Sequence, residues 1–340
     1  MSCPMATAPA RRRLARFPAL LYGVMLMMAG LGVYLLGVIG RFLCLFLDPH
    51  RQLLGLLQRV VWYAGVPVAG GLLLILFEFV ALLPGKRRRR AVAWDPPGSP
   101  DMTAVLTAYN DEPSIGLAVE DFRSHPRVRR VIVVDNNSTD RTAEVACLAG
   151  AVVVHESRQG YGRCVWRALA EGARSTDTEL TLLCEGDMTF RAYDIDKFTA
   201  YIPHAEIVNG TRIVEQLRAY NTQLTTFMYY GNFFVGKLLE AKHVGRGTFT
   251  DVGTTYKLCR NSALERLLPL VNPAVNLEFN AHFLDTALGS GFEIVECPVT
   301  FHERVGVSKG GNTNNLRSLK VGLRMILGIV TGWKGWNCKD

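Results

Sequence analysis

The chain has 340 residues, and 49% of them are hydrophobic, so material for a buried core is plentiful. Its formal net charge of +8 is unevenly placed: residues 1–90 hold 12 Lys or Arg against 2 Asp or Glu, whereas residues 91–340 hold 26 against 28. The basic excess therefore lies in the first quarter. The remainder is slightly acidic, which excludes a nucleic-acid binder of the usual basic kind.

Two long uncharged runs dominate the start of the chain. Phe17–Gly40 contains no charged residue, and Val60–Phe77 forms a second run that extends to Leu83 if Glu78 is tolerated. About 20 apolar residues suffice for a spanning helix. We therefore predict a transmembrane hairpin over 17–84, with spans of about 17–40 and 60–83. A secretory signal is disfavoured because the first run is too long and no small-residue cleavage site follows. Two buried core helices remain the alternative.

Basic residues flank this hairpin on both sides. "RRRLAR" lies in the basic segment 1–16, and "KRRRR" opens a basic, Pro-rich linker over 85–101. Because Lys and Arg stay on the cytoplasmic side, we expect a two-span membrane protein with both termini and the following domain in the cytoplasm. The same charges suit anionic lipid headgroups. Eight cysteines without a C-x-x-C pair fit that reducing compartment.

Strand and helix patterns alternate from residue 102 onward. "TAVLTA", "RVIVVD", "VVVH" and "LTLLC" read as strands, and the helix patterns "PSIGLAVEDFR", "STDRTAEVACLAGA" and "GRCVWRALAEGA" lie between them. This order predicts an α/β domain over 102–315, built on a parallel sheet covered by helices on both faces. Ligands of such sheets bind beyond the carboxyl ends of the strands.

Polar residues follow each of these four strands. The stretches are "TAYNDE", "DNNSTD", "ESRQGYGR" and "EGD", and the last contains Glu185 and Asp187 separated by one glycine. Two neighbouring carboxylates repel each other unless a cation lies between them. Mg²⁺ or Mn²⁺ shared with a diphosphate removes that penalty, and the glycine lets phosphates approach the backbone. The alternatives are a solvated pair of surface acids and an acid–base pair for sugar hydrolysis, although i and i+2 on one turn poorly supply the gap that hydrolysis needs.

Seven motifs in this region resemble those of family 2 glycosyltransferases, in particular the branch that loads a sugar onto a polyprenyl or dolichyl phosphate, as dolichol-phosphate mannose synthases do. "TAYNDE" resembles P-T-Y-N-E, "VIVVDNNSTDRT" resembles V-V-D-D-x-S-x-D-x-T, and "RQGYGRCVWRA" resembles K-x-G-x-G-x-A. "EGD" stands where the family has D-x-D. "NGTRIV", "TDVGTTYKLCRNSALERL" and "FHERVGVSKGG" are similar to G-S-R, D-x-x-T-G-Y-K-x-F-R and F-x-x-R-x-x-G-x-S-K. Asn136 replaces the usual second Asp, and Glu185 replaces the first Asp of D-x-D.

The resemblance implies a GT-A-type, Rossmann-like nucleotide-binding sheet and assigns roles residue by residue. The donor nucleotide sugar would be bound by Thr107, Tyr109, Asp111, Asp135, Asn137, Arg158, Gly160 and Gly162. The metal, Mg²⁺ or Mn²⁺, would be ligated by Glu185 and Asp187. The anionic phosphate of a polyprenyl-phosphate acceptor would be received by Arg212, Arg304 and Lys309, with Ser308 as a hydrogen-bond donor. Asp251 is a further substrate-binding candidate.

The implied reaction is an inverting, metal-dependent transfer from a UDP- or GDP-sugar to a lipid phosphate. A phosphate acceptor is already anionic, so no general base is required. If the acceptor is instead a sugar hydroxyl of a glycan or glycolipid, Asp251 or Glu278 would have to act as the base. His302 is the other base candidate, although a structural role is favoured. A non-catalytic nucleotide-binding membrane scaffold and a homo-oligomer both stay open.

The tail over 316–340 mixes apolar and basic residues, "LRSLKVGLRMILGIVTGWKGW". Its charge and length disfavour a third span. We expect an amphipathic helix in the membrane interface, with Trp333 and Trp336 at the headgroup boundary, and a plain core helix is the alternative.

Overall fold

The structure is a computed structural model that describes residues 17–47, 52–86, 92–307 and 315–334. The chain forms two compact units, residues 1–89 with 241–245 and residues 90–240 with 246–340. The predicted site residues Ser308 and Lys309 lie outside the described residues, as do Trp336, the segment 1–16 and the arginines of "KRRRR".

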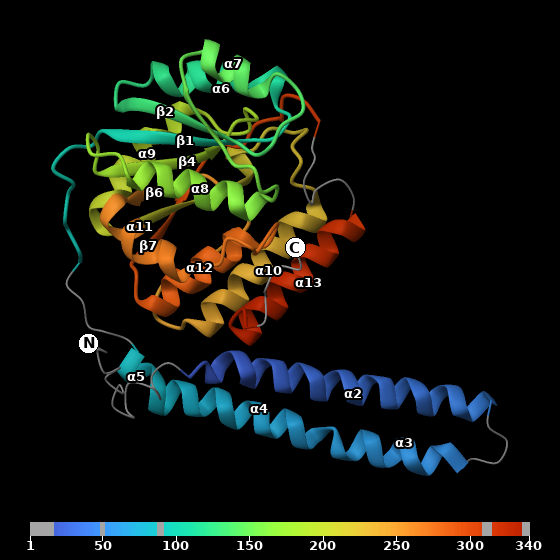
Figure 1. The fold of residues 1–340 in the computed structure, drawn as a ribbon. Coiled ribbons are helices and arrows are strands. Elements are labelled where there is room, and N and C mark those ends of the chain that lie inside the picture. The colour runs from blue at the N-terminus through green and yellow to red at the C-terminus, as the bar shows by residue number, and fades with distance from the viewer. Residues whose placement is uncertain (1–16, 48–51, 87–91, 308–314, 335–340) are drawn as a thin grey trace, which may run out of the picture. The chain divides into compact units, whose positions relative to one another are not determined.

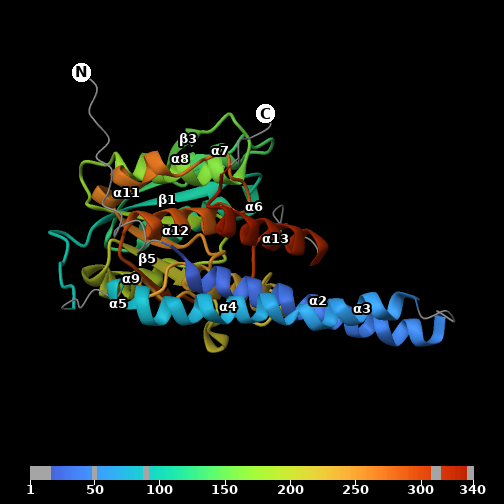
Figure 2. The same ribbon diagram turned by 90° about the horizontal axis from the view of Figure 1, so that it is seen from below.

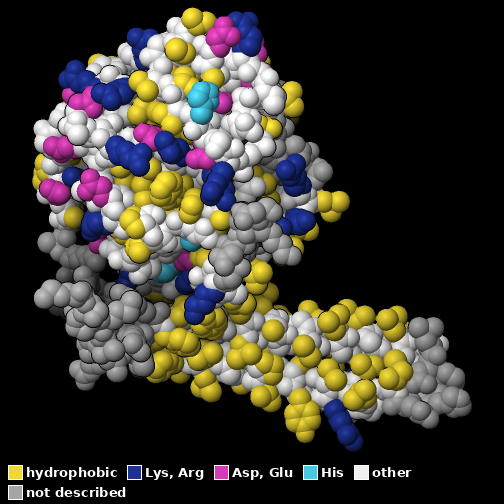
Figure 3. Space-filling view, viewed as in Figure 1, with side chains coloured by type: hydrophobic (Ala, Val, Ile, Leu, Met, Phe, Trp, Pro, Cys, Tyr) yellow, Lys and Arg dark blue, Asp and Glu magenta, His cyan; other side chains and the backbone are white. Residues whose placement is uncertain are grey.

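The first unit is a pair of long helical stretches (Figure 1). Helix α2 covers Ala19–Leu47; the second stretch joins α3 (Gln52–Tyr63), α4 (Gly65–Phe77), a π-helical turn η1 (Glu78–Leu82) and α5 (Leu83–Lys86). Both stretches are long and apolar enough to cross a bilayer, over Ala19–Phe46 and Leu53–Lys86. Hydrophobic side chains cover most of the described hairpin surface that is visible in Figure 3. Each stretch is longer than the uncharged run that predicted it, because α2 continues past Arg41 and α3 begins before Arg59.

Glycines let the two helices of the hairpin approach closely (Figure 2). Gly23, Gly30 and Gly37 are seven residues apart, which places them on one face of α2. A Cβ on Gly23 would come within 2.8 Å of the Gly71 carbonyl oxygen, and one on Gly30 would come within 2.9 Å of the Pro67 side chain. Close backbone contact of this kind is the usual means of helix association where the hydrophobic effect is absent.

Glu78, the single acid of the second stretch, is fully buried and paired. Its carboxylate accepts a hydrogen bond from the backbone N–H of Leu20, at the start of α2, and lies 2.8 Å from Lys86 Nζ. One of the unsatisfied N–H groups of the α2 N-terminus is thereby capped. This pairing accounts for a charged residue within an otherwise apolar helix.

The second unit is built on a seven-stranded sheet in the order β3-β2-β1-β4-β6-β5-β7. The strands are β1 (Met102–Ala108), β2 (Val128–Asp135), β3 (Val152–His155), β4 (Leu180–Glu185), β5 (Ile207–Thr211), β6 (Lys257–Arg260) and β7 (Ile294–Pro298). The four strands expected from the sequence pair in parallel, as predicted. The complete sheet is mixed, because β6, which the sequence analysis did not identify, runs antiparallel to both β4 and β5.

Helices cover both faces of this sheet (Figure 1). One face packs against α6 (Glu112–Ser124), α7 (Thr142–Leu148) and α9 (Ile195–Tyr201). The other packs against α8 (Tyr161–Ala173), α11 (Asn261–Leu267) and α12 (Phe279–Ser290). Successive β1 residues alternate between the two cores, Val105 facing one and Leu106 the other. Burial on both faces explains why these strands are continuously apolar.

Two further helices, α10 (Thr226–Lys242) and α13 (Asn315–Thr331), lie at one end of the domain and contribute to the wall of the same cavity (Figure 1). The C-terminal part of α13 belongs to the core, since Met325 and Ile329 are buried and Trp333, just beyond the helix, donates a hydrogen bond to Asp285 at 2.8 Å. The opposite side of α13 carries an exposed row of leucines, Leu316, Leu319, Leu323 and Leu327. Trp333 is therefore a core residue, and its predicted place at a headgroup boundary was wrong.

Candidate active site

A cavity of about 1010 Å³ lies where the predicted strand ends meet. One part of its wall is polar and comes from the residues after β1, β2, β4 and β5. The other part comes from the facing sides of α10 and α13. The polar wall is formed by Thr107, Tyr109, Asp111, Asn136, Gly160, Tyr161, Glu185, Asp187, Thr189, Arg212, Thr255, Asn280 and Arg304. The cavity therefore has the location expected for a ligand of an α/β sheet.

The loops after β1 and β2 are tied to each other. Asn110 adopts a positive φ of 53°, a conformation that Asn tolerates better than most residues. Its N–H donates to Ser138 Oγ at 2.9 Å, and its side-chain oxygen accepts from the Thr139 N–H at 2.7 Å. The Asp111 N–H donates to Thr142 Oγ1 at 2.8 Å. The polar "TAYNDE" and "DNNSTD" stretches thus brace one rim of the cavity.

Asp187 is buried at this rim, with 1% of its surface exposed. Its Oδ1 accepts hydrogen bonds from the Thr189 N–H at 3.0 Å and Thr189 Oγ1 at 2.6 Å. Burial and the neighbouring Glu185 charge raise the pKa of Asp187 to about 7, although Arg304 and Thr189 act in the opposite direction. Such a raised pKa marks a carboxylate whose negative charge the protein alone does not fully compensate.

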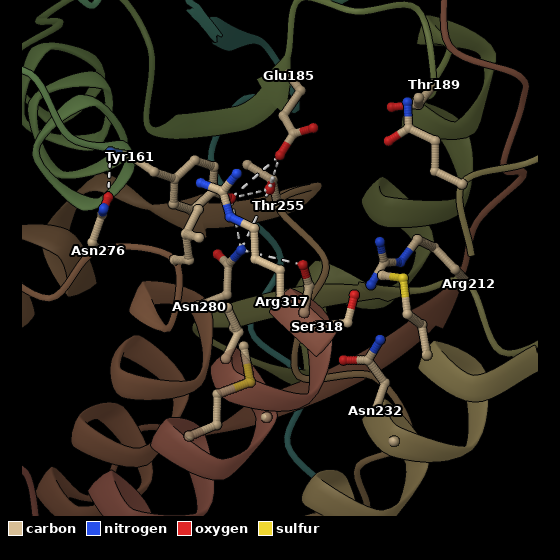
Figure 4. A pocket seen from close by; sticks show the side chains of 18 of the residues that line it. Tyr161, Glu185, Thr189, Arg212, Asn232, Thr255, Asn276, Asn280, Arg317 and Ser318 are labelled. Carbon is tan, nitrogen blue, oxygen red and sulfur yellow. Dashed lines mark hydrogen bonds between the residues drawn. The ribbon is translucent and has the colours of Figure 1, made fainter. Parts of the chain in front are cut away.

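Glu185 ends β4 and is oriented by two hydroxyl groups (Figure 4). Thr255 Oγ1 donates to Glu185 Oε1 at 2.6 Å, and Tyr161 Oη donates to the same oxygen at 3.3 Å. The other carboxylate oxygen, Oε2, accepts no hydrogen bond from the part of the chain that the structure describes. An unengaged carboxylate oxygen beside a buried second carboxylate is a suitable ligand for a hard cation.

The donor set of this corner fits Mg²⁺ or Mn²⁺ only in combination with a ligand. Across the described ranges, no group of three or more His, Cys, Asp or Glu residues lies close enough together to hold a metal ion. Glu185 and Asp187 would supply two oxygen ligands. The remaining ligands would be phosphate oxygens and water, which is the usual arrangement for Mg²⁺ at a nucleotide.

The two arginines predicted for the acceptor phosphate both line the cavity, and each is already paired. Arg304 bridges two acids, donating to Asp187 Oδ2 at 2.8 Å and to Asp111 Oδ1 at 2.7 Å. Arg212 binds Asp251 through Nε at 2.7 Å and Nη2 at 2.9 Å, and its guanidinium lies over the Phe301 ring. These pairs fix the position of both guanidinium groups at the cavity wall.

The residues predicted to bind the donor divide into two groups. Thr107, Tyr109, Asp111 and Gly160 line the cavity, whereas Asp135, Asn137, Arg158 and Gly162 do not. Asn137 and Arg158 are exposed in neighbouring loops. A Cβ at Gly162 would overlap the Val275 carbonyl oxygen, so this glycine serves helix packing. Asp135 is buried next to Asn136, and its Oδ1 accepts no hydrogen bond from any described residue.

None of the three base candidates has the surroundings of a base. Asp251 is fully buried; burial raises its pKa, but the Arg212 ion pair outweighs burial, so the net pKa is lowered. Glu278 directly precedes α12 and lies outside the cavity lining, and its Oε1 lies 3.6 Å from Arg324 Nη1. His302 also lies outside the lining, bound to Tyr193 Oη at 2.6 Å. None of Asp251, Glu278 and His302 belongs to the cavity lining, so the structure supports none of these three as a base.

Several cavity residues received no role in the sequence analysis. Tyr161 lies within "RQGYGR" and Thr255 within "TTYK". Both stretches belong to predicted motifs, but roles were predicted only for other residues in them. Asn280 is a single amide in an apolar helix, where nothing nearby in the sequence marks it. Asn136 binds Gly160 N–H through Oδ1 at 2.9 Å and so joins the β2 and β3 loops. These contacts link residues 24 or more positions apart, which local patterns do not reveal.

Comparisons with known proteins agree with this arrangement. Residues 103–268 match the model of glycosyl transferase family 2. Over 92 residues the chain is 33% identical to protein RfbJ of Shigella flexneri, covering 27% of this chain and 68% of that protein. Over 210 residues it is 27% identical to the dolichyl-phosphate hexose transferase of Haloferax volcanii, covering 62% of this chain and 86% of that protein.

The fold itself matches a solved structure. A crystal structure of glucosyl-3-phosphoglycerate synthase from Mycobacterium tuberculosis, in complex with Mn²⁺, UDP and phosphoglyceric acid, superposes with a TM-score of 0.51 at 17% identity, covering 73% of this chain and 89% of that chain. The second unit therefore has the fold of a glycosyltransferase. The chain belongs to glycosyl transferase family 2, and the predicted family, fold and enzyme class are confirmed.

Proposed function

We propose that this protein transfers a sugar from a nucleotide-sugar donor, a UDP- or GDP-sugar, to the phosphate of a polyprenyl lipid. The observation that carries the proposal is the shape of the cavity, which joins a polar corner to an apolar groove. The polar corner holds the acid pair and two arginines. The groove suits a long apolar chain attached to the reacting group, as in a lipid phosphate.

The groove runs between α10 and α13. Its α10 side is formed by Phe227, Tyr230, Phe234 and Val235, and its α13 side by Leu319, Val321, Leu323, Met325 and Ile326. Several of these side chains are more than half exposed, including Phe234 at 56% and Leu323 at 57%. Exposed apolar area in a continuous groove marks a binding surface for an apolar partner. An isoprenoid chain is such a partner, whereas a sugar hydroxyl on a hydrophilic glycan is not.

Glu185 and Asp187 would hold Mg²⁺ or Mn²⁺ against the donor diphosphate. Such a cation stabilises the negative charge that develops on the leaving nucleoside diphosphate. The relatives support this cofactor, since the mycobacterial structure contains Mn²⁺ with UDP. Asp135, whose buried Oδ1 accepts no hydrogen bond from any described residue, would be the candidate acceptor for the base or ribose.

Arg304 and Arg212 would bind and orient the acceptor phosphate, together with Lys309 and Ser308 of the segment outside the described residues. A phosphate oxygen is anionic near neutral pH, so it attacks the anomeric carbon without a protein base. The bond to the leaving diphosphate breaks on the opposite face, which inverts the anomeric configuration. The three predicted base candidates, Asp251, Glu278 and His302, all lie outside the cavity lining, which agrees with this mechanism.

The helical hairpin would anchor the enzyme in the membrane that contains this lipid. The basic segments at both ends of the hairpin support a cytoplasmic location for both termini and for the catalytic unit. The exposed leucine row of α13, flanked by Arg317, Lys320 and Arg324, fits the membrane interface. The similarity to a dolichyl-phosphate hexose transferase supports a lipid acceptor.

The proposal is tested with the purified full chain in lipid nanodiscs. Radiolabelled UDP- and GDP-sugars are incubated with polyprenyl phosphate, with polyprenol or with a soluble oligosaccharide, each with Mn²⁺ or with EDTA. We expect label in the organic phase only with polyprenyl phosphate and Mn²⁺. Transfer to the oligosaccharide with polyprenyl phosphate inert would refute the proposed acceptor. Binding of donors without any transfer would indicate a scaffold.

A further inference from the structure

Glu185 is the end of a hydrogen-bond chain that begins at a buried lysine. Lys257, in β6, has 1% of its surface exposed and donates to the Thr254 carbonyl and to Asn280 Oδ1, the latter at 3.3 Å. Asn280 Nδ2 donates to Tyr161 Oη at 2.8 Å. Tyr161 Oη and Thr255 Oγ1 are hydrogen-bonded to each other, and Thr255 Oγ1 donates to Glu185 at 2.6 Å. Figure 4 shows Asn280, Tyr161 and Thr255 converging below Glu185.

The two ends of this chain fix its direction. An amine of Lys257 donates, so the Asn280 group facing it is the carbonyl oxygen and the amide nitrogen faces Tyr161. That nitrogen can only donate, so the Tyr161 proton is available for Thr255 Oγ1 or for Glu185 Oε1, which lies 3.3 Å away. The Thr255 proton then points at Glu185, whose carboxylate can only accept. Every proton in the chain is therefore directed towards Glu185 Oε1.

The chain links four elements that are distant in sequence. Lys257 lies in β6, Asn280 in α12, Tyr161 at the start of α8, and Glu185 at the end of β4. Asn280 and Thr255 are 3% and 2% exposed. Burying so many polar groups is costly unless each is satisfied, and a satisfied network fixes one geometry. Apolar residues at these positions would avoid the free-energy cost of burying polar groups. A functional requirement for one orientation of Glu185 is therefore the simplest explanation of the network.

We propose that Tyr161, Thr255 and Asn280 are positioning residues that hold Glu185 Oε1 and thereby present Oε2 to the cation. This inference rests on the proposed function in one respect, namely that a divalent cation binds at Glu185 and Asp187. Outer partners of metal ligands orient them, and their removal typically weakens metal binding 10- to 100-fold. The side chain of Glu has one more torsion angle than that of Asp. The hydroxyl groups of Tyr161 and Thr255 would fix this additional angle.

The test measures Mn²⁺ affinity of the full chain in nanodiscs by the EPR signal of free Mn²⁺, with saturating UDP. Tyr161→Phe and Thr255→Val each remove one hydroxyl and are expected to weaken Mn²⁺ binding about tenfold. Thr255→Ser keeps the hydroxyl and should restore wild-type affinity. Tyr193→Phe is the matched control, because its hydroxyl binds His302 outside the cavity lining. The double variant should lose less than the sum of the single losses, since both act through one oxygen.

Folded Tyr161→Phe and Thr255→Val proteins that bind Mn²⁺ with wild-type affinity would overturn the inference, as would equal weakening in Thr255→Ser. Thermal unfolding establishes that each variant is folded. Wild-type protein that fails to bind Mn²⁺ in the presence of UDP would overturn the inference as well. If wild type and variants bind Mn²⁺ as expected but wild type does not glycosylate polyprenyl phosphate, the positioning role stands and the proposed acceptor is refuted.

Discussion

The two sides of the cavity are built in different ways. The side proposed to bind the donor consists of short polar loops after β1, β2 and β4, which are joined by hydrogen bonds and surround the acid pair of Glu185 and the buried Asp187. The acceptor side consists of two helices, α10 and α13, whose facing apolar side chains leave a groove partly exposed. A braced polar rim positions a diphosphate with precision, while an apolar groove accepts chains of varied length. Under the proposed function, donor chemistry and acceptor binding would therefore depend on separate parts of the domain.

Asp187→Asn should produce the largest effect and break the donor side alone. The amide keeps the shape of the side chain but loses the charge that a cation requires. We expect transfer to fall about 1000-fold, a loss comparable to the removal of a principal electrostatic group in other enzymes. Initial rates of lipid-linked sugar formation measure it, and Asp196→Asn, on the exposed side of α9, serves as the control. Retention of more than a tenth of the rate would contradict the role of Asp187.

Phe234→Glu should break the acceptor side alone. A charge placed in the groove opposes the binding of an apolar chain, so the KM for polyprenyl phosphate should rise about tenfold, while UDP affinity stays unchanged. Steady-state kinetics with varied acceptor, and calorimetry with UDP, separate the two quantities. A matched rise in the UDP dissociation constant would show that the two sides are not separable. Tyr220→Glu, at a fully exposed position, controls for added charge.

Lys257→Met tests the buried lysine from which the hydrogen-bond chain to Glu185 begins. Burial lowers the pKa of Lys257 from 10.5 to about 7. Between these values the unfolded chain binds a proton that the folded chain does not, so the stability of wild type rises with pH. From pH 7 to pH 9 the gain is about 2 kcal/mol relative to Lys257→Met. Melting curves at both pH values measure the difference, and parallel pH profiles for the two proteins would contradict the lowered pKa.

His302→Gln should have the smallest effect. His302 lies outside the cavity lining, and its backbone N–H, which donates to the Thr189 carbonyl at 2.9 Å, survives the substitution. We expect the transfer rate to stay within about twofold of wild type, because a residue without contact to the reacting atoms contributes only local packing. A 100-fold decrease with normal stability would instead identify His302 as a base and favour a hydroxyl acceptor.

The contrast between the polar loops and the apolar groove also explains which site residues could be predicted from the sequence. Glu185 and Asp187 follow a continuous apolar strand, and Asp111 follows another, so the rule for parallel sheets brought them together correctly. The rule also placed Asn137 and Arg158 near the ligand, because it locates a strand end but not the direction of each loop residue. Thus Asn136 rather than Asp135 lines the cavity.

The acceptor side was hidden because its residues are dispersed. Phe234 and Leu323 are ordinary apolar residues of two helices 89 positions apart, and nothing local marks a groove between them. The reversed strand β6 was missed because a short strand of four residues carries no sign of its direction. Likewise Trp333 beside Lys334 resembles a membrane-interface pair in the sequence, yet Asp285, which holds the indole in the core, lies 48 positions earlier.

The most direct test of the central claim is a crystal structure of the protein soaked with Mn²⁺ and UDP, with anomalous diffraction used to locate the metal. We predict one strong anomalous peak between Glu185 Oε2, Asp187 and the two phosphates of UDP. Nucleotide bound elsewhere, with the corner at Glu185 and Asp187 lacking an anomalous peak, would contradict the account.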